Sequence, residues 1–364
     1  MKKIIACCDG TWNRPGTFDG NVPVKTNVQL VFECIPKMSK KNGTEIKQLK
    51  FYETGVGSST FDKEDQVMGG MSGAGIDKKI KDIYSFIVFN YEVGDEVYLF
   101  GFSRGAYTAR SIAGFIRNCG ILKPSNIHLI NYAYDLYRDR NEYTSPDSDL
   151  MTSFRKNYCV EDITKIKFVG VWDTVGSLGL PLDFKQKYNM EKYKFHDVKL
   201  SSTIENAYHA IAVDEKRKLF EPTLWEISDN GINKGQQVEQ RWFAGVHCNV
   251  GGSYKDTGLS DLALNWLVQK AEECGLEINH PSVCNNEYYN FNPNYKGVLR
   301  DSMAWFYKIW FPKYREIGKE FRYVKMEDGT LKKIRTNEVL DESVRLRWKE
   351  AALNYRPDNL KNLI

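Results

Sequence analysis

Short apolar runs alternate with longer amphipathic segments along most of the chain. The runs have the length of β-strands and fall at residues 4–8, 48–53, 96–102, 166–172, 208–213 and 241–246. Segments with apolar residues three and four positions apart predict helices at residues 27–35, 77–90, 106–117 and 261–273. This alternation predicts an α/β fold, in which helices flank both faces of a mostly parallel central sheet.

The type of one element and the limits of the sheet and of one helix need separate predictions. The run at 208–213 fits either a strand or the end of a helix, whereas 241–246 is predicted to be the last strand of the sheet. Ser260 is a favourable N-cap for the helix at 261–273, and Gly275 is a favourable stop.

Composition narrows the function classes. The 364 residues carry a net charge of +4, from 51 basic and 47 acidic residues, which does not indicate a nucleic-acid-binding protein. The eight cysteines show no Cys-x-x-Cys spacing, so we expect reduced thiols and neither a metal nor a cofactor. No apolar stretch is long enough for a signal-peptide core or a membrane span. We therefore expect a cytoplasmic protein, or one exported without an N-terminal signal.

The predicted strand at 96–102 ends in a serine turn. Ser103 lies between Gly101 and Gly105, two residues away on each side, and a predicted helix follows directly. A serine in this setting is typical of a nucleophile elbow, a turn so tight that side chains at the glycine positions would collide with backbone. We predict that Ser103 is a nucleophile and that the backbone N–H of Arg104 stabilises an oxyanion.

A serine nucleophile needs a general base, and the chain has five histidines. His247 lies where the apolar run at 242–246 gives way to a glycine-rich stretch, which is where α/β sheets place catalytic residues. His209 lies inside an apolar run and is expected to be a hydrogen-bonded core residue. We predict His247 as the base.

The orienting carboxylate is predicted by the same geometry. Asp173 ends an apolar strand and opens a loop. The chain order Ser103, Asp173, His247 is that of the catalytic triad in α/β hydrolases. Asp214, which also ends an apolar run, is the alternative acid; otherwise it pairs with a nearby lysine or arginine at the surface.

The loop after the first strand completes the predicted site. An oxyanion hole needs a second backbone N–H, and Gly10 or Thr11 supplies one directly after the strand at 4–8. Asp9, in the same loop, is expected to hold the loop in shape through hydrogen bonds. Cation binding is the alternative for Asp9, although no second ligand is visible.

These motifs together resemble the large α/β-hydrolase family, long described as uncharacterised, that includes the type VI secretion phospholipase effectors. The matching segments are 9–13, 101–106, 171–176, 210–215, 242–247 and 355–360. The resemblance implies an α/β-hydrolase-like fold, a Ser103–Asp173–His247 triad and ester hydrolysis, with glycerophospholipids as substrates of the effector branch. The family often has an aspartate two residues after the histidine. That position is Asn249 here, and we expect it to support the site loop.

Two segments interrupt the alternation within a single predicted domain of residues 1–364. Residues 121–162 are expected to form a helical cap, which hydrolases often insert at this point. Residues 285–340 are expected to form an aromatic-rich accessory or lid segment. Aromatic side chains beside a mild positive charge are compatible with peripheral membrane contact through 301–324, but their spacing favours the alternative that they form the buried face of a helix.

The predicted function is that of a serine hydrolase that cleaves carboxylic esters through an acyl-enzyme. Phospholipids or other lipids are the expected substrates, and a soluble ester or thioester is the alternative. A non-catalytic hydrolase-fold binding module is a second class of function, which predicts a broken triad. The expected partners are therefore a lipid or small ester and no nucleic acid; the sequence identifies no protein partner.

Overall fold

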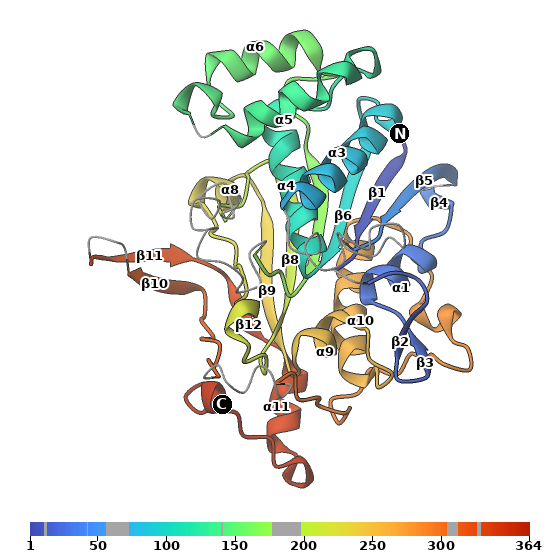
Figure 1. Cartoon of the computed structure of the whole chain (residues 1–364), viewed down its shortest axis with the longest axis vertical. Coiled ribbons are helices and arrows are strands. Elements are labelled where there is room, and N and C mark those ends of the chain that lie inside the picture. Colours follow the sequence, from blue (N-terminus) through green and yellow to red (C-terminus); the bar gives the residue numbers. More distant parts are fainter. Residues whose placement is uncertain are drawn as a thin grey trace.

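One central sheet organises the chain (Figure 1). The computed structural model describes residues 1–10, 13–41, 43–55, 73–139, 141–176, 198–303, 312–325 and 329–364. Within these residues the sheet has eight strands, and neighbouring strands are parallel except for the antiparallel pair β4–β5. In spatial order the strands are β12 (Glu338–Leu340), β9 (Gln237–Phe243), β8 (Ile204–Ala212), β7 (Ile166–Trp172), β6 (Glu96–Phe102), β1 (Lys3–Cys8), β5 (Thr44–Glu53) and β4 (Met38–Lys41).

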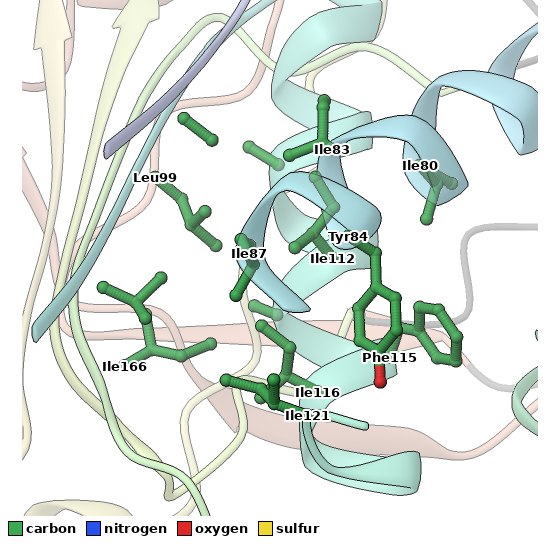
Figure 2. Close-up of a cluster of buried hydrophobic side chains, with 14 of the residues drawn as sticks. Ile80, Ile83, Tyr84, Ile87, Leu99, Ile112, Phe115, Ile116, Ile121 and Ile166 are labelled. Carbon is green, nitrogen blue, oxygen red and sulfur yellow. The ribbon is translucent and has the colours of Figure 1, made fainter. Parts of the chain in front are cut away.

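Helices cover both faces of this sheet, because each strand alternates buried side chains between two cores. One face carries α3 (Gly73–Asn90) and α4 (Arg104–Cys119), and the other carries α1 (Asn27–Cys34), α9 (His247–Gly251) and α10 (Gly258–Glu273). In β1, Ile4 and Ala6 belong to the first core, whereas Ile5 and Cys7 belong to the second. Figure 2 shows the first core, in which isoleucines of α3 and α4 form one cluster with Leu99 of β6.

The α/β fold with a mostly parallel sheet is confirmed, with corrections at its boundaries. The run at 208–213 is part of strand β8. The strand at 241–246 is not the last of the sheet, because β12 pairs with the outer side of β9. Helix α10 begins at Gly258 with Thr257 at its N-cap position, so Ser260 is not the cap. Its hydroxyl instead donates back to the Thr257 carbonyl, 2.9 Å away.

The predicted cap does not lie over Ser103. Residues 121–162 form α5 (Ile130–Arg138) and α6 (Asp149–Tyr158), with short helices η2 (Pro124–Leu129) and η3 (Glu142–Thr144). Cys119, the last residue of α4, contacts the carbonyl of Ala133, and Cys159 contacts the carbonyl of Cys119. The insertion therefore begins and ends at the end of α4 that is about 22 Å from its serine end, given a rise of about 1.5 Å per residue, and its helix α5 packs against both α4 and α3 (Figure 1).

The C-terminal region is more integrated than an accessory segment. Hairpin strands β10 (Phe321–Lys325) and β11 (Leu331–Arg335) precede β12, which joins the central sheet, and α11 (Glu342–Lys349) follows. Val344, Tyr355 and Leu360 share a core with Ile211 of β8 and Trp242 of β9. The aromatic run at 305–311, on which the membrane-contact prediction depends, lies outside the described residues.

The remaining elements are short. They are β2 (Thr17–Asp19), β3 (Val22–Val24), α8 (Asp229–Asn233), η5 (Lys218–Phe220), η6 (Pro281–Cys284), η8 (Ala351–Leu353) and η9 (Asp358–Leu360). Among the helices in the described ranges, none is both long and apolar enough to cross a bilayer.

Candidate active site

Ser103 lies at the turn between β6 and α4. Its backbone has φ 57° and ψ −122°, a strained conformation that non-glycine residues rarely adopt and that clusters at functional sites. Its N–H donates to the carbonyl of Trp172 at 3.0 Å, which ties the turn to the end of β7. The side chain is therefore held above the ends of two central strands.

Gly101 and Gly105 permit this turn. A Cβ built at Gly101 would lie 2.6 Å from the Cα of Ala106. A Cβ built at Gly105 would overlap with the carbonyl of Cys8, because α4 starts directly against the end of β1. Both contacts are with backbone, which cannot move aside, so both positions require glycine.

Asp173 and His247 form a buried, hydrogen-bonded pair next to this turn. Asp173 follows β7 directly and has φ 39°, and His247 is the first residue of α9. The two side chains meet with His247 Nδ1 2.5 Å from Asp173 Oδ2. The glycine-rich stretch after the histidine was expected to be a loop, but its first four residues form the short helix α9 together with His247.

Two aromatic rings hold the imidazole in place. The ring of Phe102, the residue before Ser103, lies against His247 with centroids 4.6 Å apart, and the Phe220 ring meets it edge-on at 4.9 Å. These contacts bring the imidazole to the serine turn. Among the described residues no hydrogen bond joins the Ser103 hydroxyl to His247, and such catalytic contacts often tighten only when substrate binds.

Burial and charge set the protonation states of the pair. Burial lowers the pKa of His247 below its ordinary value, against the opposing hydrogen bond and charge of Asp173. Burial would raise the pKa of Asp173, but the charge of Arg315 and the bond to His247 hold it well below its ordinary value. At neutral pH the site thus combines a neutral imidazole with a carboxylate, the state in which the imidazole can accept a proton.

Arg315 is a site residue that sequence reasoning missed. Its guanidinium binds both carboxylate oxygens of Asp173, with Nη1 2.6 Å from Oδ1 and Nη2 3.0 Å from Oδ2. The two residues are 142 positions apart, and Arg315 lies in a polar segment that matches no motif. No pattern in the sequence pointed to it.

Asp214 and Glu215 support the histidine from its backbone side. Asp214 accepts hydrogen bonds from the Gly245 N–H at 2.7 Å and from the Tyr355 hydroxyl, so the structure places this alternative acid away from the imidazole nitrogens. Glu215 accepts the N–H of His247 at 3.2 Å. Burial would raise the pKa of Glu215, but its bonds to Arg217 lower it to about 2, so this carboxylate is charged.

In the predicted oxyanion loop, the Gly10 N–H is not free to bind an oxyanion, whereas Asp9 holds the loop through hydrogen bonds. The Gly10 N–H donates to Asp9 Oδ1 at 2.7 Å, so this N–H does not point at a substrate here. Thr11 lies outside the described residues. Asp9 also accepts the hydroxyls of Thr26, at 2.6 Å, and Tyr52, and its carboxylate joins the loop to α1 and β5. Burial raises the pKa of Asp9 to about 6 despite these bonds.

Asn249 and His209 hold neighbouring segments. Asn249 Oδ1 accepts the N–H groups of Val246, at 3.3 Å, and Arg300, at 3.1 Å, which joins α9 to the segment after α10. His209 Nε2 accepts the N–H of Thr174 at 3.0 Å, and burial lowers the pKa of His209 to about 3. His209 is thus the neutral, hydrogen-bonded core histidine that the sequence predicts. No cluster of potential metal ligands occurs in the described ranges.

Comparisons with known proteins give a family and distant structural relatives. The model of the family described as T6SS, phospholipase effector Tle1-like, catalytic domain, matches residues 2–270. An uncharacterized protein of Saccharomyces cerevisiae is 29% identical over 239 residues, which make up 60% of this chain and 32% of the yeast protein.

Two solved structures resemble the chain at 18% identity each. An uncharacterized protein from Pseudomonas aeruginosa has a TM-score of 0.42, over 77% of this chain and 47% of its own. The Tle1 effector bound to the VgrG spike from the type 6 secretion system has a TM-score of 0.38, over 70% of this chain and 52% of its own. The chain thus spans about a third of the yeast protein and about half of each solved chain.

Proposed function

The chain belongs to the Tle1-like family of type VI secretion phospholipase effectors, matched in the catalytic domain, and from this premise we propose that it is a serine hydrolase that cleaves acyl esters of phospholipids. The observation that carries the proposal is the buried Asp173–His247 pair beside the strained turn of Ser103. A hydroxyl, an imidazole and a carboxylate at adjoining strand ends are the parts that acyl transfer requires.

In this mechanism the imidazole works through its second nitrogen. Asp173 accepts a hydrogen bond from the N–H at His247 Nδ1, which leaves Nε2 as the acceptor for the Ser103 hydroxyl. The serine oxygen attacks the ester carbonyl and forms an acyl-enzyme, and the alcohol leaves with the proton from His247. Water then attacks the acyl-enzyme with His247 again as base. The bond between the acyl carbon and the Ser103 oxygen breaks, the fatty acid leaves, and His247 returns the proton to Ser103. Asp173 stabilises the imidazolium in both steps.

The oxyanion requires two backbone N–H groups. Arg104 opens α4, where first-turn N–H groups and the helix dipole favour negative charge. The second donor is expected from the loop after β1, as Gly10 or Thr11; the Gly10 N–H is bonded to Asp9, and Thr11 lies outside the described residues. The acid, base, nucleophile and oxyanion loop all follow the carboxyl ends of parallel strands, which supports an α/β-hydrolase fold.

Purified protein is expected to release fatty acid from mixed phospholipid vesicles or micelles. A panel of phospholipid classes, matched lysophospholipids and short soluble esters, read out by mass spectrometry of the products, tests this substrate class. Cleavage of the soluble esters alone would exclude phospholipids and leave a general esterase. No cleavage of any ester, together with no labelling by a fluorophosphonate probe, would favour a binding module instead. Membrane contact through 301–324 stays a prediction, which vesicle sedimentation can address.

The loss of activity on the acid side of the pH–rate profile (the acid limb) is expected at a pH below the ordinary pKa of histidine. Burial lowers the pKa of His247 from its ordinary 6.5, and the base must be neutral. The fall of kcat/KM on a soluble ester at acid pH should therefore have its midpoint below 6.5. A pH–rate profile in constant-ionic-strength buffers, with thermal melting at each pH, measures this. A midpoint above 6.5 in folded protein contradicts the assignment.

A further inference from the structure

The guanidinium of Arg315 joins three parts of the site. Besides the two oxygens of Asp173, it donates from Nη1 to the carbonyl of Ala212, 2.8 Å away, and from Nη2 to the carbonyl of Phe220. Asp173 directly follows β7, Ala212 ends β8 and Phe220 ends the short helix η5. One planar fork therefore fixes the relative positions of three chain segments that surround His247.

Two of the residues that Arg315 binds, Asp173 and Phe220, also contact the imidazole of His247. Asp173 Oδ2 is shared between Arg315 Nη2, at 3.0 Å, and His247 Nδ1, at 2.5 Å, so the fork sets the direction in which this oxygen faces the histidine. The Phe220 carbonyl is held by the same Nη2, and the Phe220 ring lies edge-on to the imidazole. Arg315 thus constrains His247 both through its carboxylate partner and through its aromatic neighbour.

This ion pair is fully withdrawn from water. Asp173 is 0% exposed and Arg315 is 6% exposed. A buried pair of this kind often contributes little net stability, because desolvation offsets the attraction, and apolar replacements can be as stable. Stability alone therefore does not explain why a charged arginine is placed on the carboxylate that faces His247.

The segment that carries Arg315 is itself anchored to the site. Asn359 Nδ2 donates to the carbonyls of Arg315, at 3.1 Å, and Val213, at 3.0 Å. Tyr355 bonds to Asp214 beside the same strand end. Arg315, Tyr355 and Asn359 all come after residue 270, where the family match ends. The last part of the chain therefore builds part of the site.

We infer that Arg315 is a positioning residue for the acid–base pair, supplied by the C-terminal region, which keeps Asp173 ionised and aimed at His247. The inference rests on the proposed function. The positive charge of Arg315 also offsets the negative charge of Asp173, which would otherwise raise the pKa of His247. The charged groups that face His247 are Asp173, Glu215 and Arg217, with Arg315 behind Asp173.

The test compares Arg315→Gln with Arg315→Lys on a soluble ester. In Arg315→Gln we expect kcat to fall about 100-fold with KM nearly unchanged, because the base is misaligned and the substrate is not contacted. The acid limb should move to higher pH, since loss of a nearby cation favours the imidazolium. Arg315→Lys keeps the positive charge but lacks the planar guanidinium that binds both oxygens of Asp173. Its acid limb should therefore match that of wild type, and its kcat should lie between those of Arg315→Gln and wild type.

Arg322→Gln is the matched control. Arg322 lies in the same region and binds buried Glu338, with Nη2 2.6 Å from Oε2, but touches neither Asp173 nor His247 among the described contacts. It should lose stability without a change in the pH profile of the folded protein. A double-mutant cycle adds Arg315→Gln to Asp173→Asn, where it should cost far less than 100-fold, because its partner is already altered.

Three results would overturn the inference. They are a wild-type kcat and pH profile in Arg315→Gln, equal kinetic losses in Arg322→Gln, and full additivity in the cycle. If Arg315→Gln does not fold, Arg315→Lys alone decides, since wild-type kcat in that variant excludes a role for the fork. Loss of activity in Ser103→Ala alongside any of these results would leave the proposed function standing, whereas activity retained in Ser103→Ala removes the function itself.

Discussion

Replacing Ser103 with alanine is expected to reduce ester cleavage by about 10⁶-fold, the loss found when the nucleophile of a serine hydrolase is removed. The reason is that no other group in the proposed mechanism can form the acyl-enzyme. Alanine keeps the Cβ of serine, so the strain of the φ 57° turn is the same in both proteins. The Ser103 side chain makes no described hydrogen bond, and the free energy of unfolding should therefore stay within about 0.5 kcal/mol of wild type.

The measurement has two readouts and a matched control. Fluorophosphonate labelling, located by peptide mass spectrometry, should disappear in Ser103→Ala together with hydrolysis. Ser111→Ala removes a serine that is also buried, at 3% exposed, in the same helix α4, and it should keep labelling and activity. Labelling or turnover that survives in Ser103→Ala would mean that the nucleophile is elsewhere.

The sheet could be predicted because its signal is local. A parallel strand buried on both faces is a continuous apolar run, and β1, β6 and β7 were each visible as one. Strand β12 was not, because it has three residues, Glu338–Leu340, and owes its place to pairing with β9 rather than to its own pattern. Ser260 failed as a cap because Thr257 and Gly258 already start the helix.

The candidate site divides in the same way. Ser103, Asp173 and His247 could be proposed because each follows a recognisable apolar run, and parallel strands bring their carboxyl ends to one edge. Arg315 could not, because its role depends on a contact between segments 142 residues apart. The hydrogen bond from the Gly10 N–H to the Asp9 carboxylate could not be predicted either, because it depends on how the Asp9 side chain is oriented.

The insertion at 121–162 was predicted to be a helical cap from its place between the serine helix and the next strand. Helix α4 carries the chain to the opposite end of the sheet before α5 begins, and the order of elements alone does not reveal where the insertion then packs. Contacts with Asp173 and His247 come from Arg315 and from Phe220 of η5, and neither residue belongs to a motif in the sequence.

Asp173→Asn is expected to lower kcat about 10⁴-fold, because every group around this side chain is a donor. Oδ1 accepts from Ala212 N, at 2.9 Å, and from Arg315 Nη1, while Oδ2 accepts from His247 Nδ1 and Arg315 Nη2. An asparagine must turn its NH₂ group toward one of these pairs. Facing His247, it forces the proton onto Nε2 and removes the base; facing Arg315, it leaves a buried cation without its partner.

The control for this prediction is another buried aspartate surrounded by donors. Asp261 in α10 accepts from Thr257 Oγ1, at 2.8 Å, Tyr289 Oη, at 3.1 Å, and Asn292 N, at 2.9 Å. Asp261→Asn should therefore also destabilise the fold, by about 1–3 kcal/mol in urea titration, but its kcat per folded molecule should equal that of wild type. Equal kinetic losses in the two variants would show that Asp173 matters only for folding. A loss confined to Asp173→Asn, with a folded protein, places the carboxylate in the acid–base step, because only Asp173 holds the proton on His247 Nδ1 and so leaves Nε2 free to take the Ser103 proton.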